Sequence, residues 1–144
     1  MDYEGQICRA PMERGSYMLP VRVGCSYNRC SFCNLFRHVK SRVLPLEEIE
    51  KELHRVKCLG GHPKKIFLGD GNAFDLNSDR LFEILEMIDH YFPGQREINA
   101  DATVTGVLAK MLAEHQDARG RYSYVYGICQ DMQKRENDKM VWEK

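Results

Sequence analysis

Apolar residues recur at helical spacing in two long segments of the chain. Between 45 and 59 they are Leu46, Ile49, Leu53, Val56 and Leu59. Steps of three and four place them on one face of a helix, with Pro45 in its first turn and Gly60 and Gly61 ending it. A second helix is predicted over about 78–92, where the same spacing holds for Leu81, Ile84, Leu85, Ile88 and Phe92.

The predicted second helix also has boundary signals. Asn77 and Ser78 are candidate caps at its start, and Pro93 with Gly94 ends it. A third helix is expected around 107–118, where the apolar face is thinner.

Four short apolar or alternating stretches predict strands between these helices. They lie in YMLPVRVGC (17–25), which ends at Gly24, in KKIFLGDGNAF (64–74), where the strand Ile66 to Leu68 breaks at Gly69, in EINADATV (97–104) and in YSYVYGI (122–128). Strands that alternate with helices indicate a parallel sheet with right-handed crossovers. We therefore expect an α/β core over 17–128 with about four parallel strands and three helices. An irregular lead-in over 1–16 precedes it, and a charged tail over 129–144 follows it as a loose helix or a disordered segment.

Composition narrows the class of protein. The chain has 144 residues, which favours one domain, and its 21 basic and 21 acidic residues balance. A balanced charge gives no indication of a nucleic-acid or membrane partner. The first residues contain no apolar run, so a signal peptide is not expected. Six cysteines without an export signal predict a cytoplasmic protein with reduced thiols, available for metal binding or catalysis.

Three cysteines lie close together in GCSYNRCSFCNLFR, residues 24–37. Cys25, Cys30 and Cys33 are separated by four and then two residues. Thiolates are soft ligands that select zinc or iron–sulfur clusters. His38 would complete a four-ligand zinc site, whereas a cubane cluster on three thiolates keeps one iron open. Spacing alone leaves both sites possible, together with a third interpretation as core cysteines.

Other polar residues are predicted to lie at the same edge of the sheet. Gly69, Asp70, Gly71 and Asn72 follow the second strand, and Asn99, Asp101 and Thr103 alternate along the third. Ligands of parallel α/β folds meet the loops beyond the carboxyl ends of the strands. We expect a polar pocket shared with the cysteines; the alternatives are a solvated edge strand and a plain strand-to-helix turn.

The segment 24–37 closely resembles the cysteine motif of the radical S-adenosylmethionine (SAM) superfamily, in the subset with four residues between the first two cysteines. The resemblance continues through PLEEIEKEL, IFLGDGNAF and INADATVTG, and it weakens after about residue 110. It implies that Cys25, Cys30 and Cys33 hold a [4Fe-4S] cluster whose open iron binds SAM. An external electron donor would then drive cleavage of SAM to a 5′-deoxyadenosyl radical, which abstracts hydrogen from an unknown substrate.

The resemblance also implies roles for other residues. Phe32 matches an aromatic that lies against the adenine. Residues 69–72 match the glycine-rich motif for the SAM amino group, to which Asp70 would offer a carboxylate. Asp101 and Thr103 would contact SAM or substrate. The remaining cysteines, Cys8, Cys58 and Cys129, are expected to be structural.

The chain departs from the family pattern in its later part. Members have six strand–helix units, and about four strands are counted here. A carboxylate that follows the fourth strand in the family is replaced by Cys129 after Gly127 and Ile128. We therefore expect a truncated half-barrel that associates with itself or another protein to cover its open face. A non-catalytic remnant and a small zinc domain using His38 are the alternative functions.

Overall fold

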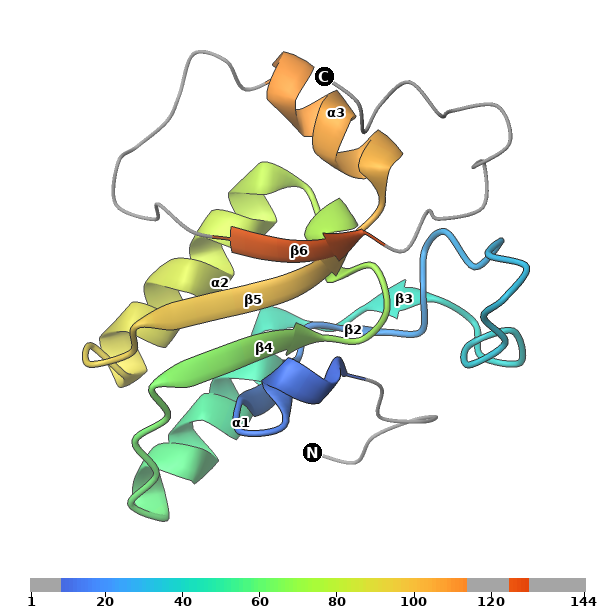
Figure 1. Ribbon diagram of the computed structural model, residues 1–144. Coiled ribbons are helices and arrows are strands. Elements are labelled where there is room, and N and C mark those ends of the chain that lie inside the picture. Colours follow the sequence, from blue (N-terminus) through green and yellow to red (C-terminus); the bar gives the residue numbers. More distant parts are fainter. Residues whose placement is uncertain (1–8, 114–124, 130–144) are drawn as a thin grey trace.

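The structure, a computed structural model, describes residues 9–113 and 125–129, with side chains through Lys110. Within these residues one sheet has four parallel strands that lie side by side in chain order (Figure 1). The strands are β1 (Tyr17–Pro20), β4 (Lys65–Gly69), β5 (Glu97–Ala102) and β6 (Val125–Cys129). The α/β prediction is confirmed at this level.

Three α-helices connect or follow these strands: α1 (Leu46–Cys58), α2 (Ser78–Tyr91) and α3 (Val104–Ala113). Chain-ordered parallel strands with right-handed crossovers place the connecting helices on one face of the sheet. The core confirms this for α1 and α2, because their apolar faces pack with alternate residues of β1, β4 and β5 (Figure 1). The fully buried members include Leu19, Ile49, Leu53, Ile66, Leu68, Ile84 and Ile88. The strand residues between them face the opposite side of the sheet.

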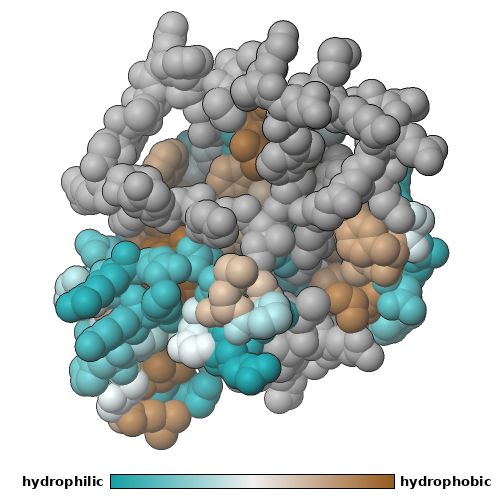
Figure 2. Space-filling view, in the orientation of Figure 1, coloured by the Kyte–Doolittle hydropathy of each residue, from teal (hydrophilic) through white to brown (hydrophobic). Residues whose placement is uncertain are grey.

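The exposed positions of α1 and α2 are mostly polar. In the space-filling view the described surface at lower left is mostly hydrophilic, with isolated hydrophobic residues (Figure 2). The exposed large hydrophobic side chains belong to separate elements and loops, and they are Met12, Phe32, Val43, Leu59 and Leu108. None of the helices described has the length and apolar character that a membrane span requires.

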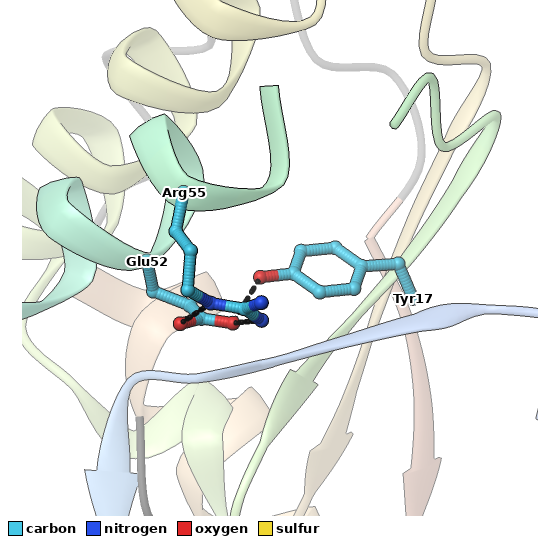
Figure 3. A network of polar contacts seen from close by, with 3 residues as sticks. All are labelled: Tyr17, Glu52 and Arg55. Carbon is cyan, nitrogen blue, oxygen red and sulfur yellow. Dashed lines mark hydrogen bonds and ion pairs between the residues drawn. The ribbon is translucent and has the colours of Figure 1, made fainter. Parts of the chain in front are cut away.

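A polar contact fixes α1 against the edge strand β1. Glu52 is buried and accepts two hydrogen bonds from the Arg55 guanidinium, at 2.9 and 2.6 Å (Figure 3). The Tyr17 hydroxyl donates to the same carboxylate at 3.3 Å. The hydrogen bonds from Arg55 lower the pKa of Glu52, so the carboxylate stays charged beside Arg55 and Tyr17. The contact therefore orients α1 on β1.

The start of α2 is capped as the sequence predicts. The Asn77 side chain accepts a hydrogen bond from the Arg80 N–H at 2.9 Å. We expect Asn77→Ala to lower the free energy of unfolding by about 1 kcal/mol, because one donor of the first turn loses its partner. Urea unfolding followed by circular dichroism measures this change. Asn77→Ser restores an acceptor and is expected to recover most of the loss; equal losses in both variants would contradict the capping role.

The segment 17–25 is not one strand, which corrects the sequence prediction. It divides into β1 and a two-residue strand β2 (Arg22–Val23), which pairs antiparallel with β3 (Arg42–Val43). The physical reason is the length of the neighbour, because β4 ends at Gly69 opposite Pro20. Beyond that point β2 pairs with β3, while the Arg22 carbonyl still accepts the Asp70 N–H at 3.3 Å. Residues 24–41 are therefore held as the loop of a hairpin.

Other boundaries differ from the predicted ones by smaller amounts. The first two helices begin and end within about a residue of their predicted positions, although Pro45 is the cap of α1 rather than part of its first turn. α3 begins at Val104, earlier than expected, because the Thr103 hydroxyl accepts the Gly106 N–H at 3.1 Å and starts the helix there. Residues 1–8, the end of the predicted third helix and the tail after Cys129 lie outside the described residues, so those predictions stay untested.

Candidate functional site

Two loops approach very closely at the carboxyl edge of the sheet. The turn after β4 lies directly on the start of the cysteine loop, with Gly71 against Cys25. A Cβ atom placed on Gly71 would lie 2.7 Å from the Cys25 Cβ and 2.8 Å from its Cα, and the φ angle of Gly71 is +45°. Both the space and the backbone conformation therefore require glycine at this position. The two motifs that were expected to lie at the same edge of the sheet are therefore in contact at this point.

Asn72 forms hydrogen bonds to three different segments at the carboxyl edge of the sheet. Its amide nitrogen donates to the Ser26 hydroxyl at 3.1 Å, and its side-chain oxygen accepts the Thr103 N–H at 3.0 Å. Its backbone carbonyl accepts from the Arg22 guanidinium at 3.0 Å. Both ends of the buried Asn72 amide are therefore used within the protein. In this conformation it positions the loops, a role that the sequence did not reveal.

Asp70 is a buried carboxyl group beside the cysteine loop. Burial raises its pKa to about 6, and a hydrogen bond from the Gly24 backbone opposes that rise. The Asp70 carboxyl group therefore ionises close to neutral pH. Its hydrogen-bond partner Gly24 directly precedes Cys25 in the chain, so the carboxyl group lies beside the start of the cysteine loop. This placement agrees with the predicted position of Asp70 in the site.

Local hydrogen bonds shape the first half of the cysteine loop. The Asn28 N–H donates to the Cys25 sulfur at 3.5 Å, and Asn28 itself has a φ of +45°. Its side-chain amide donates to the Phe36 carbonyl at 3.0 Å. Asparagine tolerates the left-handed conformation better than most residues, so Asn28 folds the loop back over Cys25.

Arg37 holds the second half of the loop. Its guanidinium donates to the Cys30 carbonyl at 3.1 Å and to the Cys33 carbonyl at 3.2 Å. Cys30 is buried and Cys33 is half-buried. Phe32 between them is 56% exposed, so much of this residue is accessible to solvent.

A buried cation lies under the same loop. Arg22 donates to the Ser41 hydroxyl at 2.8 Å as well as to Asn72. Burial lowers the pKa of Arg22, while the charges of Asp75 and Cys25 act in the opposite direction. An arginine keeps its proton under such conditions, so positive charge is fixed near Cys25.

The three loop thiols are the candidate ligand set for a metal. Cys25, Cys30 and Cys33 form no disulfide, and no group of three or more His, Cys, Asp or Glu side chains among the described residues is gathered so as to hold a metal ion. The exposed His38 does not complete such a group. The chemistry of the donor set does fit an iron–sulfur cluster, because three soft ligands share a loop with an N–H donor to sulfur and with Arg37, and the Arg22 cation lies nearby. Cluster binding would require the thiols to turn toward one point.

The polar residues Asn99, Asp101 and Thr103, predicted to alternate along one strand, have partners in different parts of the structure. Thr103 belongs to the site through its bond to Asn72, whereas Asn99 contacts Glu13 of the lead-in at 2.6 Å. Asp101 lies between them; burial, and next the charge of Glu13, raise its pKa to about 7. Sequence reasoning missed Glu13, because an isolated glutamate in an irregular segment carries no periodic signal.

Comparison of the chain with protein-family models, with curated proteins and with solved structures found no match. The residues and their geometry are therefore the basis on which a function is assigned.

Proposed function

We propose that the chain is the amino-terminal part of a radical SAM domain, in which Cys25, Cys30 and Cys33 bind a [4Fe-4S] cluster and the turn 69–72 binds SAM. The observation that carries the proposal is the contact of Gly71 with Cys25. A glycine turn after the second parallel strand, packed on a three-cysteine loop after the first, is the arrangement that the sequence resemblance implies.

The winding of the sheet supports a partial barrel. In a doubly wound sheet the strand order reverses and helices cover both faces. Here the strands follow chain order, and α1 and α2 pack on one face, as in a (β/α) barrel. The site also lies where barrel enzymes place theirs, at the carboxyl ends of the strands.

The protein residues have separable roles in this proposal. When bound, the cluster and SAM would supply an electron and a carbon radical that abstracts hydrogen from the substrate. Asp70, with a pKa of about 6, would be ionised at neutral pH and accept a hydrogen bond from the SAM ammonium group. The exposed ring of Phe32 would cover the adenine. Asn72 would hold the cysteine loop, the turn and β5 in register.

The proposed function implies partners and a location. The electron donor and the substrate would be separate molecules in the cytoplasm. Association with a second chain would cover the edge of the sheet beyond β6, the last strand in the described part of the chain.

Anaerobic reconstitution with iron and sulfide, followed by electron paramagnetic resonance of the reduced protein, tests the function. We expect a [4Fe-4S] signal that shifts when SAM is added, because SAM would bind the open iron. A cluster signal that SAM leaves unchanged would exclude the SAM site while keeping the cluster. Stoichiometric zinc without any cluster would contradict the proposal and favour a zinc-stabilised α/β domain.

A further inference from the structure

The cysteine loop, residues 24–41, is joined to the rest of the chain by a very short hairpin. In Figure 1 the loop extends to the right of β2 and β3, beyond the main sheet. Each of these strands has two residues, and Arg22 pairs with Val43 and Val23 with Arg42. A two-stranded hairpin is only marginally stable in water by itself. The loop therefore needs a further attachment if its cysteines are to keep a fixed position relative to the sheet.

The side chain of Arg22 supplies such an attachment. Arg22 is only 5% exposed, and its guanidinium donates hydrogen bonds to two separate segments. Nη1 donates to the Asn72 carbonyl, in the turn after β4, at 3.0 Å. Nη2 donates to the Ser41 hydroxyl, at the far end of the cysteine loop, at 2.8 Å. One planar group thus joins the loop to the turn.

The backbone contacts around Arg22 place this attachment at the base of the loop. The Arg22 carbonyl accepts the Asp70 N–H at 3.3 Å, so the turn is bonded to both the backbone and the side chain of one residue. The two ends of the loop lie side by side, since a Cβ atom placed on Gly24 would be 3.5 Å from the Ser41 Cα. The bond to Ser41 therefore acts next to Cys25, which follows Gly24 in the chain.

The hydrogen bonds of Arg22 matter because its guanidinium is buried. Both acceptors are neutral oxygens, and Nε is enclosed without an acceptor among the described residues. A buried N–H group that loses its partner is left without a hydrogen bond, because water does not reach it. Lysine would keep the charge, but its single nitrogen does not reproduce two donors set apart on a rigid plane. The contacts of Arg22 thus depend on the shape of the guanidinium group as well as on its charge.

We propose that Arg22 is a positioning residue that holds the cysteine loop on the turn 69–72 through Ser41 and Asn72, so that the loop and the turn form one rigid unit for a ligand that contacts both. We call this pair of contacts the Arg22 clasp. A ligand that contacts two independent segments must restrict the motion of each of them, which costs conformational entropy. The clasp reduces this cost, because the two segments are already fixed relative to each other before the ligand binds.

The clasp concerns the protein alone, and only its effect on SAM rests on the proposed function. In that function the cysteine loop would hold the cluster and the turn would hold the amino group of SAM. Arg22 would then raise the affinity for SAM indirectly, through the positions of Ser41 and Asn72.

Hydrogen exchange of the full chain without iron, read by mass spectrometry at constant pH, tests the clasp. The loop offers reporters, because the N–H groups of Asn28, Cys33 and Val39 donate hydrogen bonds within it. We expect Ser41→Ala and Arg22→Lys each to lower the protection of peptides from 24–41 by about tenfold, the size of effect that loss of a hydrogen bond to a charged group produces. Peptides from α2 are expected to keep their protection.

Two control variants make the exchange measurement specific. Ser41→Thr keeps a hydroxyl acceptor and is expected to restore most of the protection that Ser41→Ala loses. Arg96→Lys is the same substitution at an exposed arginine before β5, and it is expected to behave as the unchanged protein. Unchanged loop protection in both Ser41→Ala and Arg22→Lys would overturn the proposal. So would equal losses in Ser41→Ala and Ser41→Thr, or an equal fall in α2 of Ser41→Ala, which would report general unfolding.

Electron paramagnetic resonance of the reconstituted protein tests the effect on SAM. We expect Ser41→Ala to keep its cluster content, because all three thiols remain, and to need about tenfold more SAM for the same shift of the signal. Ser41→Thr is expected to respond as the unchanged protein. An equal response to SAM in Ser41→Ala and the unchanged protein would overturn the effect of the clasp on the ligand and leave the proposed function intact. Absence of a cluster in the unchanged protein would contradict the proposed function, and hydrogen exchange would still decide whether the clasp exists.

Discussion

Alanine in place of Cys25, Cys30 or Cys33 is expected to lower the iron and sulfide bound after anaerobic reconstitution by at least about tenfold. Loss of an outer-shell partner alone commonly costs 10–100-fold in metal affinity, and loss of a direct thiolate ligand is expected to cost no less. The expectation holds for each of the three positions separately. Iron and sulfide content, together with visible absorption, measure it.

Two control variants distinguish a cluster on these three thiols from a zinc site and from iron bound nonspecifically by exposed thiols. Cys58→Ala removes an exposed thiol at the end of α1 and is expected to keep full iron content. His38→Ala is also expected to keep full iron content, because His38 is not a ligand of a cubane cluster bound by three cysteines. Iron binding that survives the loss of Cys33, or disappears with His38, would contradict the proposed ligand set.

Alanine in place of Gly71 is expected to lower the free energy of unfolding by about 2–5 kcal/mol. A left-handed conformation costs a non-glycine residue about 1–2 kcal/mol. The added methyl group would also lie 2.7 Å from the Cys25 Cβ, and relieving such an overlap costs typically about 1–3 kcal/mol. The affected atoms belong to the backbone and the Cβ of Cys25, so no flexible side-chain end can simply move aside. Urea unfolding at constant pH measures the change.

Gly60→Ala is the matched control for the Gly71 variant. Gly60 has a φ of +75°, yet no heavy atom lies within 4 Å of a Cβ placed there. We expect a loss of about 1–2 kcal/mol from the backbone alone. The Gly71 variant is also expected to bind less iron, because Cys25 must shift. Equal losses of stability in the two variants, with iron binding intact, would show that the contact with Cys25 does not shape the site.

Elements that depend on one-sided burial could be predicted closely from the sequence. Ile49 and Leu53 in α1, and Ile84 and Ile88 in α2, are fully buried on the faces that their spacing indicated. The apolar run at 66–68 likewise became β4 and ended at Gly69. In each case the prediction depends on local sequence, because the spacing of apolar residues within a short segment indicates both the type of element and the face that is buried.

Features that depend on partners distant in the chain could not be predicted. Nothing within 17–25 indicates that Arg22 and Val23 leave the main sheet, since that depends on where β4 ends and on the position of Arg42 and Val43. The contact of Glu13 with Asn99 joins segments 86 residues apart. No periodicity within either segment reports such a pairing.

The candidate site was predictable in its location and less so in its details. Parallel strands bring their carboxyl ends to one edge, so the approach of Gly71 to Cys25 follows from the order of the elements. The roles of individual side chains were harder to foresee. Asn72 was expected to contact a ligand, and the structure adds that its amide bonds to Ser26 and Thr103. Hydrogen-bond partners are settled by exact side-chain placement, which spacing does not specify.

The chain order of the strands also has a consequence for folding. Each strand pairs with the one that precedes it in the main sheet, so every pairing closes a single loop. The connection between β1 and β4 contains the cysteine loop and α1, and it is about twice as long as that between β5 and β6. A doubling of length raises the entropic cost of closure by only about 0.6 kcal/mol. The hairpin of β2 and β3 shortens the effective loop further, so early pairing of these two strands would speed the step that brings Cys25 to Gly71.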